Sequence, residues 1–66
     1  MKASEVKELS AEDLRAKLKD LRSELFNLRF QMATSQINNT AEASRVKKDI
    51  ARLLTELRAR ELSAQN

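Results

Sequence analysis

Apolar residues between positions 14 and 32 recur at steps of four, three, four, three and four, and this spacing constrains the fold more than any other feature. At about 3.6 residues per turn, such steps keep the side chains on one side of a helix, whereas a strand would require alternation with a period of two. The segment is therefore predicted to be a helix with one apolar stripe, formed by Leu14, Leu18, Leu21, Leu25, Leu28 and Met32.

A second segment carries a similar stripe, stepping three, four, three and four. An isolated amphipathic helix gains little stability in water, so each stripe is best buried against the other. The chain is predicted to be an all-α protein, an antiparallel two-helix hairpin that resembles a coiled coil. The residues of the second stripe are Ala43, Val46, Ile50, Leu53 and Leu57, with Leu54 widening it.

One domain over residues 1–66 is expected, with the first helix over about 11–33, a link over 34–40 and the second helix over about 41–62. Ser10 is predicted to cap the first helix, with Asp13 completing a capping box. The polar link has neither Gly nor Pro, so a continuous helix that dimerises is the competing structure. Before Ser10, a short helical turn capped by Ser4 is expected to fold onto the hairpin.

The composition excludes several classes of function. The 66 residues include no Cys and no His, so disulfides, zinc sites and the usual pairs of nucleophile and base are absent. No enzyme activity, cofactor, metal or small-molecule substrate is predicted. No apolar run approaches the ~20 residues of a membrane span, and the charged N-terminal segment does not resemble a secretory signal. A soluble cytoplasmic protein without a membrane partner is expected.

The net charge of +3 is concentrated around the link. The window 27–52 holds five basic and two acidic residues, whereas the rest of the chain holds eight of each. Within this window Arg45, Lys48 and Arg52 follow one another at steps of three and four, so they share a helix face directed away from the partner helix. Several cations on one rigid surface favour phosphate binding; a face that is merely solvated is the alternative.

Phe26 and Phe30 are the only aromatic residues, and they lie four positions apart, off the leucine stripe. Two exposed phenylalanines are unusual on a small protein. Either the N-terminal segment covers them through Val6 and Leu9, or they contact a partner. They are assigned here as a contact for a partner protein, with an RNA groove as the other possible occupant.

Two blocks of the sequence resemble the bacterial large-subunit ribosomal protein family number twenty-nine. The first is Phe-Asn-Leu-Arg-Phe-Gln at 26–31, followed by Ala33 and Thr34, and the second is Val-Lys-Lys-Asp-Ile-Ala-Arg at 46–52. The similarity covers nearly the whole chain without gaps.

The resemblance implies a non-catalytic antiparallel two-helix protein of the ribosome. Its expected partners are large-subunit ribosomal RNA near the polypeptide exit tunnel and the neighbouring ribosomal protein twenty-three. The alternative function is a coiled-coil interaction module that dimerises or docks on a partner helix. The residues expected to contact RNA are Asn27, Arg29, Gln31, Lys47, Lys48 and Arg52, with Asn39 in the link and Arg45 as an additional cation.

Overall fold

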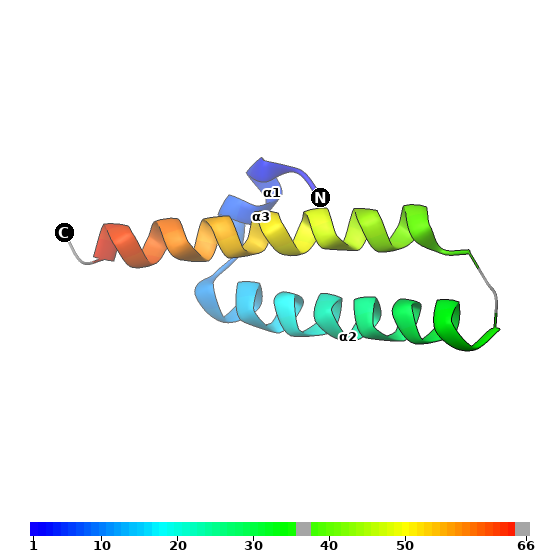
Figure 1. Cartoon of the computed structure of the whole chain (residues 1–66). Coiled ribbons are helices and arrows are strands. Elements are labelled where there is room, and N and C mark those ends of the chain that lie inside the picture. The colour runs from blue at the N-terminus through cyan, green and yellow to red at the C-terminus, as the bar shows by residue number, and fades with distance from the viewer. Residues whose placement is uncertain (36–37, 65–66) are drawn as a thin grey trace.

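The computed structural model describes residues 1–35 and 38–64, and these form three helices and no strand. Helix α1 spans Ala3–Glu8, α2 spans Ala11–Ser35 and α3 spans Thr40–Ala64. The two long helices run antiparallel, and α1 lies beside α3 (Figure 1). The predicted all-α hairpin is confirmed, and a continuous helix through the link is ruled out because α3 returns along α2. Gln36 and Ile37, which belong to the predicted link, lie outside the described residues.

The start of α2 is fixed by Ser10. The backbone amide of Asp13 donates a hydrogen bond to Ser10 Oγ at 3.1 Å, and the amide of Leu14 donates to the Ser10 carbonyl oxygen at 2.9 Å. Ser10 is thus the cap, as predicted, since its hydroxyl satisfies the Asp13 amide, which the first turn leaves without a backbone partner. Within residues 1–35 and 38–64, the Ser10 amide does not donate to the Asp13 carboxylate. The reciprocal bond of the predicted capping box is therefore missing.

The start of α1 differs from the prediction. Lys2, not Ser4, is the N-cap residue, and the Lys2 amide donates to Glu5 Oε2 at 3.3 Å. Because Glu5 stands three positions after Lys2, its carboxylate reaches back over the first turn. Ser4 therefore lies inside that turn and does not cap it.

Polar side chains form hydrogen bonds on both sides of the link. Thr34 Oγ1 and Ser35 Oγ donate to the carbonyl oxygens four positions before them, at 2.8 and 2.7 Å. At the other side, Asn38 Oδ1 accepts hydrogen bonds from the amide and the hydroxyl of Thr40, at 3.2 and 2.6 Å. An Asn side chain that bonds two residues onward forms an Asx-type turn, and this turn leads into α3.

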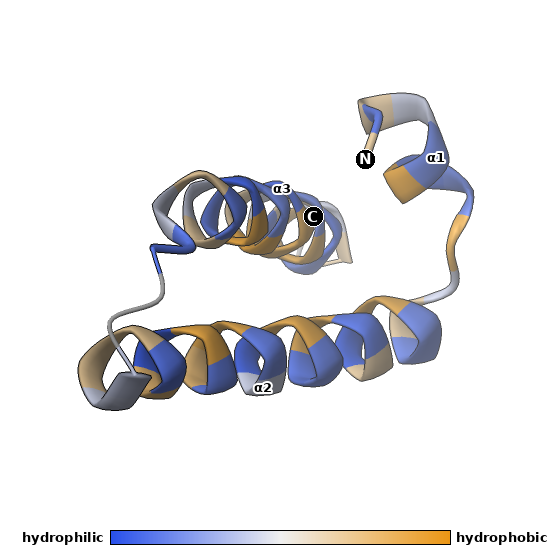
Figure 2. Ribbon diagram, turned by 90° about the vertical axis from the view of Figure 1, so that its right-hand side faces the viewer, coloured by the Kyte–Doolittle hydropathy of each residue, from blue (hydrophilic) through white to orange (hydrophobic). Residues whose placement is uncertain are grey.

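The apolar side chains form two adjoining clusters between the helices. Figure 2 shows the hydrophobic residues of α2 gathered on the side that faces α3. The cluster near the link contains Leu28, Ala43 and Val46. The second cluster lies where α1 packs, and Leu21 and Ile50 border both clusters. The buried members of the second cluster are Val6, Leu14, Leu18 and Leu53.

The hairpin is an elongated rod of 48 × 17 × 16 Å. The C-terminal end of α3 extends past the start of α2 (Figure 1), and the exposed Leu54 and Leu62 line a shallow hollow on α3. Among residues 1–35 and 38–64, no helix has a stretch apolar enough to cross a membrane.

Candidate nucleic-acid interface

Three basic side chains of α3 form one surface, which we call the basic ridge: Arg45, Lys48 and Arg52. Their neighbours Val46 and Leu53 are buried against α2. Positions at steps of three and four share a helix face, and the face of the ridge points away from the one that packs on α2. All three ridge residues are exposed, so the predicted direction of this surface is correct.

The three ridge residues differ in their bonding partners within the protein. Arg52 Nη1 donates a hydrogen bond to the carbonyl oxygen of Met1 and lies 3.8 Å from Asp49 Oδ1. The same carboxylate oxygen lies 3.5 Å from the amino group of Met1. Arg52 therefore connects α3 to the N-terminal segment and also meets solvent, to which 51% of its side chain is exposed.

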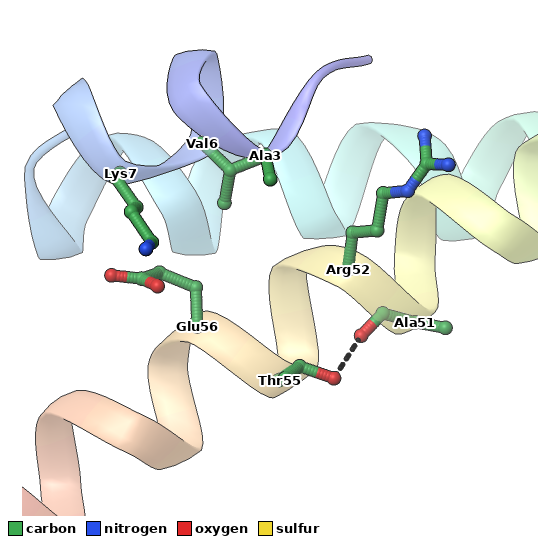
Figure 3. A pocket seen from close by; sticks show the side chains of 7 residues that line it. All are labelled: Ala3, Val6, Lys7, Ala51, Arg52, Thr55 and Glu56. Carbon is green, nitrogen blue, oxygen red and sulfur yellow. Dashed lines mark hydrogen bonds between the residues drawn. The ribbon is translucent and has the colours of Figure 1, made fainter.

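Helix α1 is fastened to α3 along a groove of about 270 Å³. In Figure 3, Ala3 and Val6 point toward α3, and the side chains of Lys7 and Glu56 point toward each other. At the far end, Arg60 Nη2 donates to the Lys7 carbonyl oxygen at 3.1 Å, while Arg60 Nε donates to Glu56 Oε1 at 3.1 Å. The link-proximal end of the ridge is consequently left exposed.

Sequence patterns do not reveal the anchors of α1. In the sequence, Asp49 and Arg60 look like ordinary helix-surface charges, because their partners are the terminal amino group of Met1 and the backbone carbonyl of Lys7. Backbone groups carry no side-chain signal, and only the docked position of α1 reveals these contacts.

Two of the predicted RNA-contact residues meet directly. Asn39 Nδ2 donates a hydrogen bond to Gln31 Oε1 at 3.1 Å, which joins the end of α2 to the residue before α3. Asn39 is half-buried and Gln31 is exposed. Each amide retains its other polar atom for a further hydrogen bond.

The remaining predicted residues do not share one surface. Asn27, Arg29 and Lys47 are all exposed. On α2, Asn27 and Arg29 lie immediately before and after the buried Leu28, so they project from opposite flanks of the apolar stripe. The predicted residues therefore surround the link half of the hairpin and do not form a single patch.

The two phenylalanines are exposed on α2. Phe26 has 69% and Phe30 has 61% of its surface accessible. The alternative in which Val6 and Leu9 cover them is wrong, because both residues pack into the core cluster with Leu14. The reason is that α1 folds against α3, whereas the phenylalanines face away from the apolar stripe of α2.

Comparison with known proteins gives consistent matches. The family described as Ribosomal L29 protein matches residues 4–60. The large ribosomal subunit protein uL29 of Oenococcus oeni is 60% identical over 65 residues, covering 98% of this chain and 94% of that protein. The uL29 proteins of Geobacillus stearothermophilus and Corynebacterium urealyticum are 55% and 62% identical, over 97% and 91% of this chain and 97% and 78% of their own lengths.

The family match spans most of the chain, including the two blocks at 26–31 and 46–52. The relatives are similar along nearly the whole sequence. Together with the helical hairpin, these matches show that the chain belongs to the Ribosomal L29 protein family.

Proposed function

We propose that this chain is a structural, non-catalytic constituent of the large ribosomal subunit that binds ribosomal RNA through the link end of its hairpin. The relatives it matches are large ribosomal subunit proteins by name. The observation that carries the RNA assignment is the charge distribution: the whole net charge of +3 lies within residues 27–52, and the cations of that window are exposed.

The link end suits a polyanion for electrostatic reasons. Arg45 and Lys48 take part in no hydrogen bond or ion pair among the described residues, so binding phosphate there requires no internal bond to break. Arg29 and Lys47 add exposed positive charge from the flanks. Contacts of this kind hold the RNA backbone and position the protein without reading base sequence.

The salt dependence of RNA binding tests this proposal. For Arg45→Ala with Lys48→Ala, the slope of log affinity against log salt should become shallower by about one unit for each phosphate that is no longer neutralised. Lys17→Ala with Arg58→Ala removes the same charge from outside the link window and serves as the matched control. Binding of large-subunit RNA is measured by filter retention across a salt series. Equal slopes for the two double variants would refute the RNA assignment at the link.

The position within the subunit is a finer part of the proposal. We place the hairpin near the polypeptide exit tunnel, beside ribosomal protein twenty-three. Chemical cross-linking of intact large subunits, followed by mass spectrometry, should link lysines of this chain to that neighbour. Cross-links only to proteins remote from the tunnel would contradict the placement.

A coiled-coil dimer is less well supported. Its seam would be the leucine stripes, but those stripes pack against each other within the hairpin, where Leu14 and Leu53 have no accessible surface. On α2 the stripe already packs against α3, so a dimer through it would have to displace that contact.

A further inference from the structure

A second basic surface lies on α2, away from the basic ridge. Its residues follow at helical steps of mostly three and four along one flank of the apolar stripe, and we call it the outer stripe. Every member is exposed. The outer stripe consists of Arg15, Lys19, Arg22, Phe26, Arg29 and Phe30.

The charges of α2 are segregated around the helix. Between Arg15 and Phe30 the outer stripe contains no carboxylate, because Asp20 and Glu24 lie on the other flank of the leucines. Although the charges outside residues 27–52 sum to zero, the outer stripe is therefore a locally positive face. A surface of this kind attracts a polyanion even where the average charge is zero.

The phenylalanines lie within this positive face. Arg22 stands one turn before Phe26, and Arg29 stands between the two rings along the helix. Exposed aromatic rings next to arginines are the arrangement on which unpaired bases stack while the cations hold their phosphates. A purely apolar protein groove would not require Arg22 and Arg29 beside the two rings, or the further cations Arg15 and Lys19 along the same flank, so the charge complementarity favours RNA over the protein contact predicted from the sequence.

We propose that the outer stripe binds unpaired nucleotides of large-subunit ribosomal RNA, with bases stacked on Phe26 and Phe30 and phosphates held by Arg22 and Arg29. This inference rests on the proposed ribosomal function and adds a second RNA site to it. The ridge and the outer stripe belong to different helices, and neither faces the contact between α2 and α3. The hairpin, a rod about 17 Å thick, would then contact two RNA segments. The basic ridge of α3 would bind one of them, and the outer stripe of α2 would bind the other.

Stacking can be measured directly because the chain has no Trp or Tyr to interfere. The probe is a short oligouridine with one central 2-aminopurine, whose fluorescence is quenched when the base stacks. Wild-type protein should quench it. Phe26→Ala with Phe30→Ala should abolish the quenching and weaken binding by about tenfold or more, and the corresponding Leu variant should do the same because it keeps apolar area without a ring.

Charge variants separate this site from the ridge. Arg22→Gln with Arg29→Gln should weaken binding of the oligouridine, while the matched Lys17→Gln with Arg58→Gln should not. Arg45→Ala with Lys48→Ala should weaken this binding less than Arg22→Gln with Arg29→Gln, because the ridge cations lie on the other long helix. Circular dichroism verifies that each variant is folded, which is expected because every substituted side chain is exposed.

Two results would overturn the inference while leaving the proposed function in place. The first is full quenching, or full affinity, in the Ala or Leu variants of the phenylalanines. The second is that the Phe26 and Phe30 variants bind RNA like the wild type but are poorly incorporated into large subunits. That result would make the outer stripe a contact for a protein. An unchanged salt slope for Arg45→Ala with Lys48→Ala would instead refute the proposed function.

Discussion

Leu53 and Leu54 are adjacent residues of α3 with opposite surroundings. Leu53 has no accessible surface and packs with Val6, Leu14 and Leu18, whereas Leu54 is 41% exposed. The difference follows from the turn of about 100° between neighbouring helical positions. In a chain with few buried side chains, each buried leucine contributes a large part of the stability.

Replacing the two leucines should therefore have unequal effects. Leu53→Ala removes buried methyl groups and leaves a cavity, so it should lower the free energy of unfolding by about 2–5 kcal/mol. Leu54→Ala is the matched control, and it should change the free energy much less. Urea unfolding followed by circular dichroism measures both. Similar destabilisation of both variants would contradict the described register of α3.

A polar residue, Ser10, determines where α2 begins. Ser10→Ala removes the acceptor for the Asp13 amide and should cost about 1 kcal/mol, whereas Ser10→Asp should retain the cap. Thermal unfolding of the three proteins provides the comparison. If Ser10→Ala has the same melting temperature as the wild type, the cap does not contribute to stability.

At the scale of elements, α1 is the least independent helix. Its six residues are too few for a stable isolated helix, so its structure depends on Val6 in the core and on the bonds to Arg52 and Arg60. The long helices, by contrast, bury a continuous stripe against each other.

Loosening α1 should therefore leave the hairpin folded. Val6→Ser places a hydroxyl in the core cluster and should detach α1, so trypsin should cleave after Lys7 faster than in wild type. The control is Glu8→Ala, an exposed position on the same helix. Cleavage rates are compared under native conditions while circular dichroism follows the long helices. Unchanged cleavage in Val6→Ser would show that Val6 does not hold α1.

The difference between α1 and the long helices explains how far the fold is predictable from sequence. Steps of three and four over long segments predict the two helices and their buried faces, and the exposed ridge follows from the same periodicity. The place of α1 does not follow, because six residues carry no periodic signal and its anchors bond to backbone oxygens of Met1 and Lys7. Sequence alone therefore presents Arg52 as a free cation, although it also holds the N-terminal segment.

The two phenylalanines show a similar limit at the candidate site. Their spacing predicts a shared face away from the leucines, and their exposure agrees with it. Whether Val6 and Leu9 cover that face depends on the direction in which the chain turns at Ser10. Local sequence does not determine that direction; the packing of Val6 against Leu53 and Leu14 does.

At the scale of the whole molecule, the hairpin is a thin rod with basic surfaces on outward faces and surplus charge toward the link. A chain without Cys allows a single thiol to be placed at a chosen position on this rod. Ser44 lies next to Arg45 at the link end, and Ser63 lies near the opposite end of the same helix; both are exposed.

The sharpest experiment tethers an iron–EDTA group to Ser44→Cys or to Ser63→Cys and generates hydroxyl radicals in large subunits assembled with each protein. We expect strong, localised cleavage of large-subunit RNA from position 44 and weaker cleavage from position 63. Absence of cleavage from position 44 together with strong cleavage from position 63 would contradict the proposal that the link end of the hairpin meets the RNA.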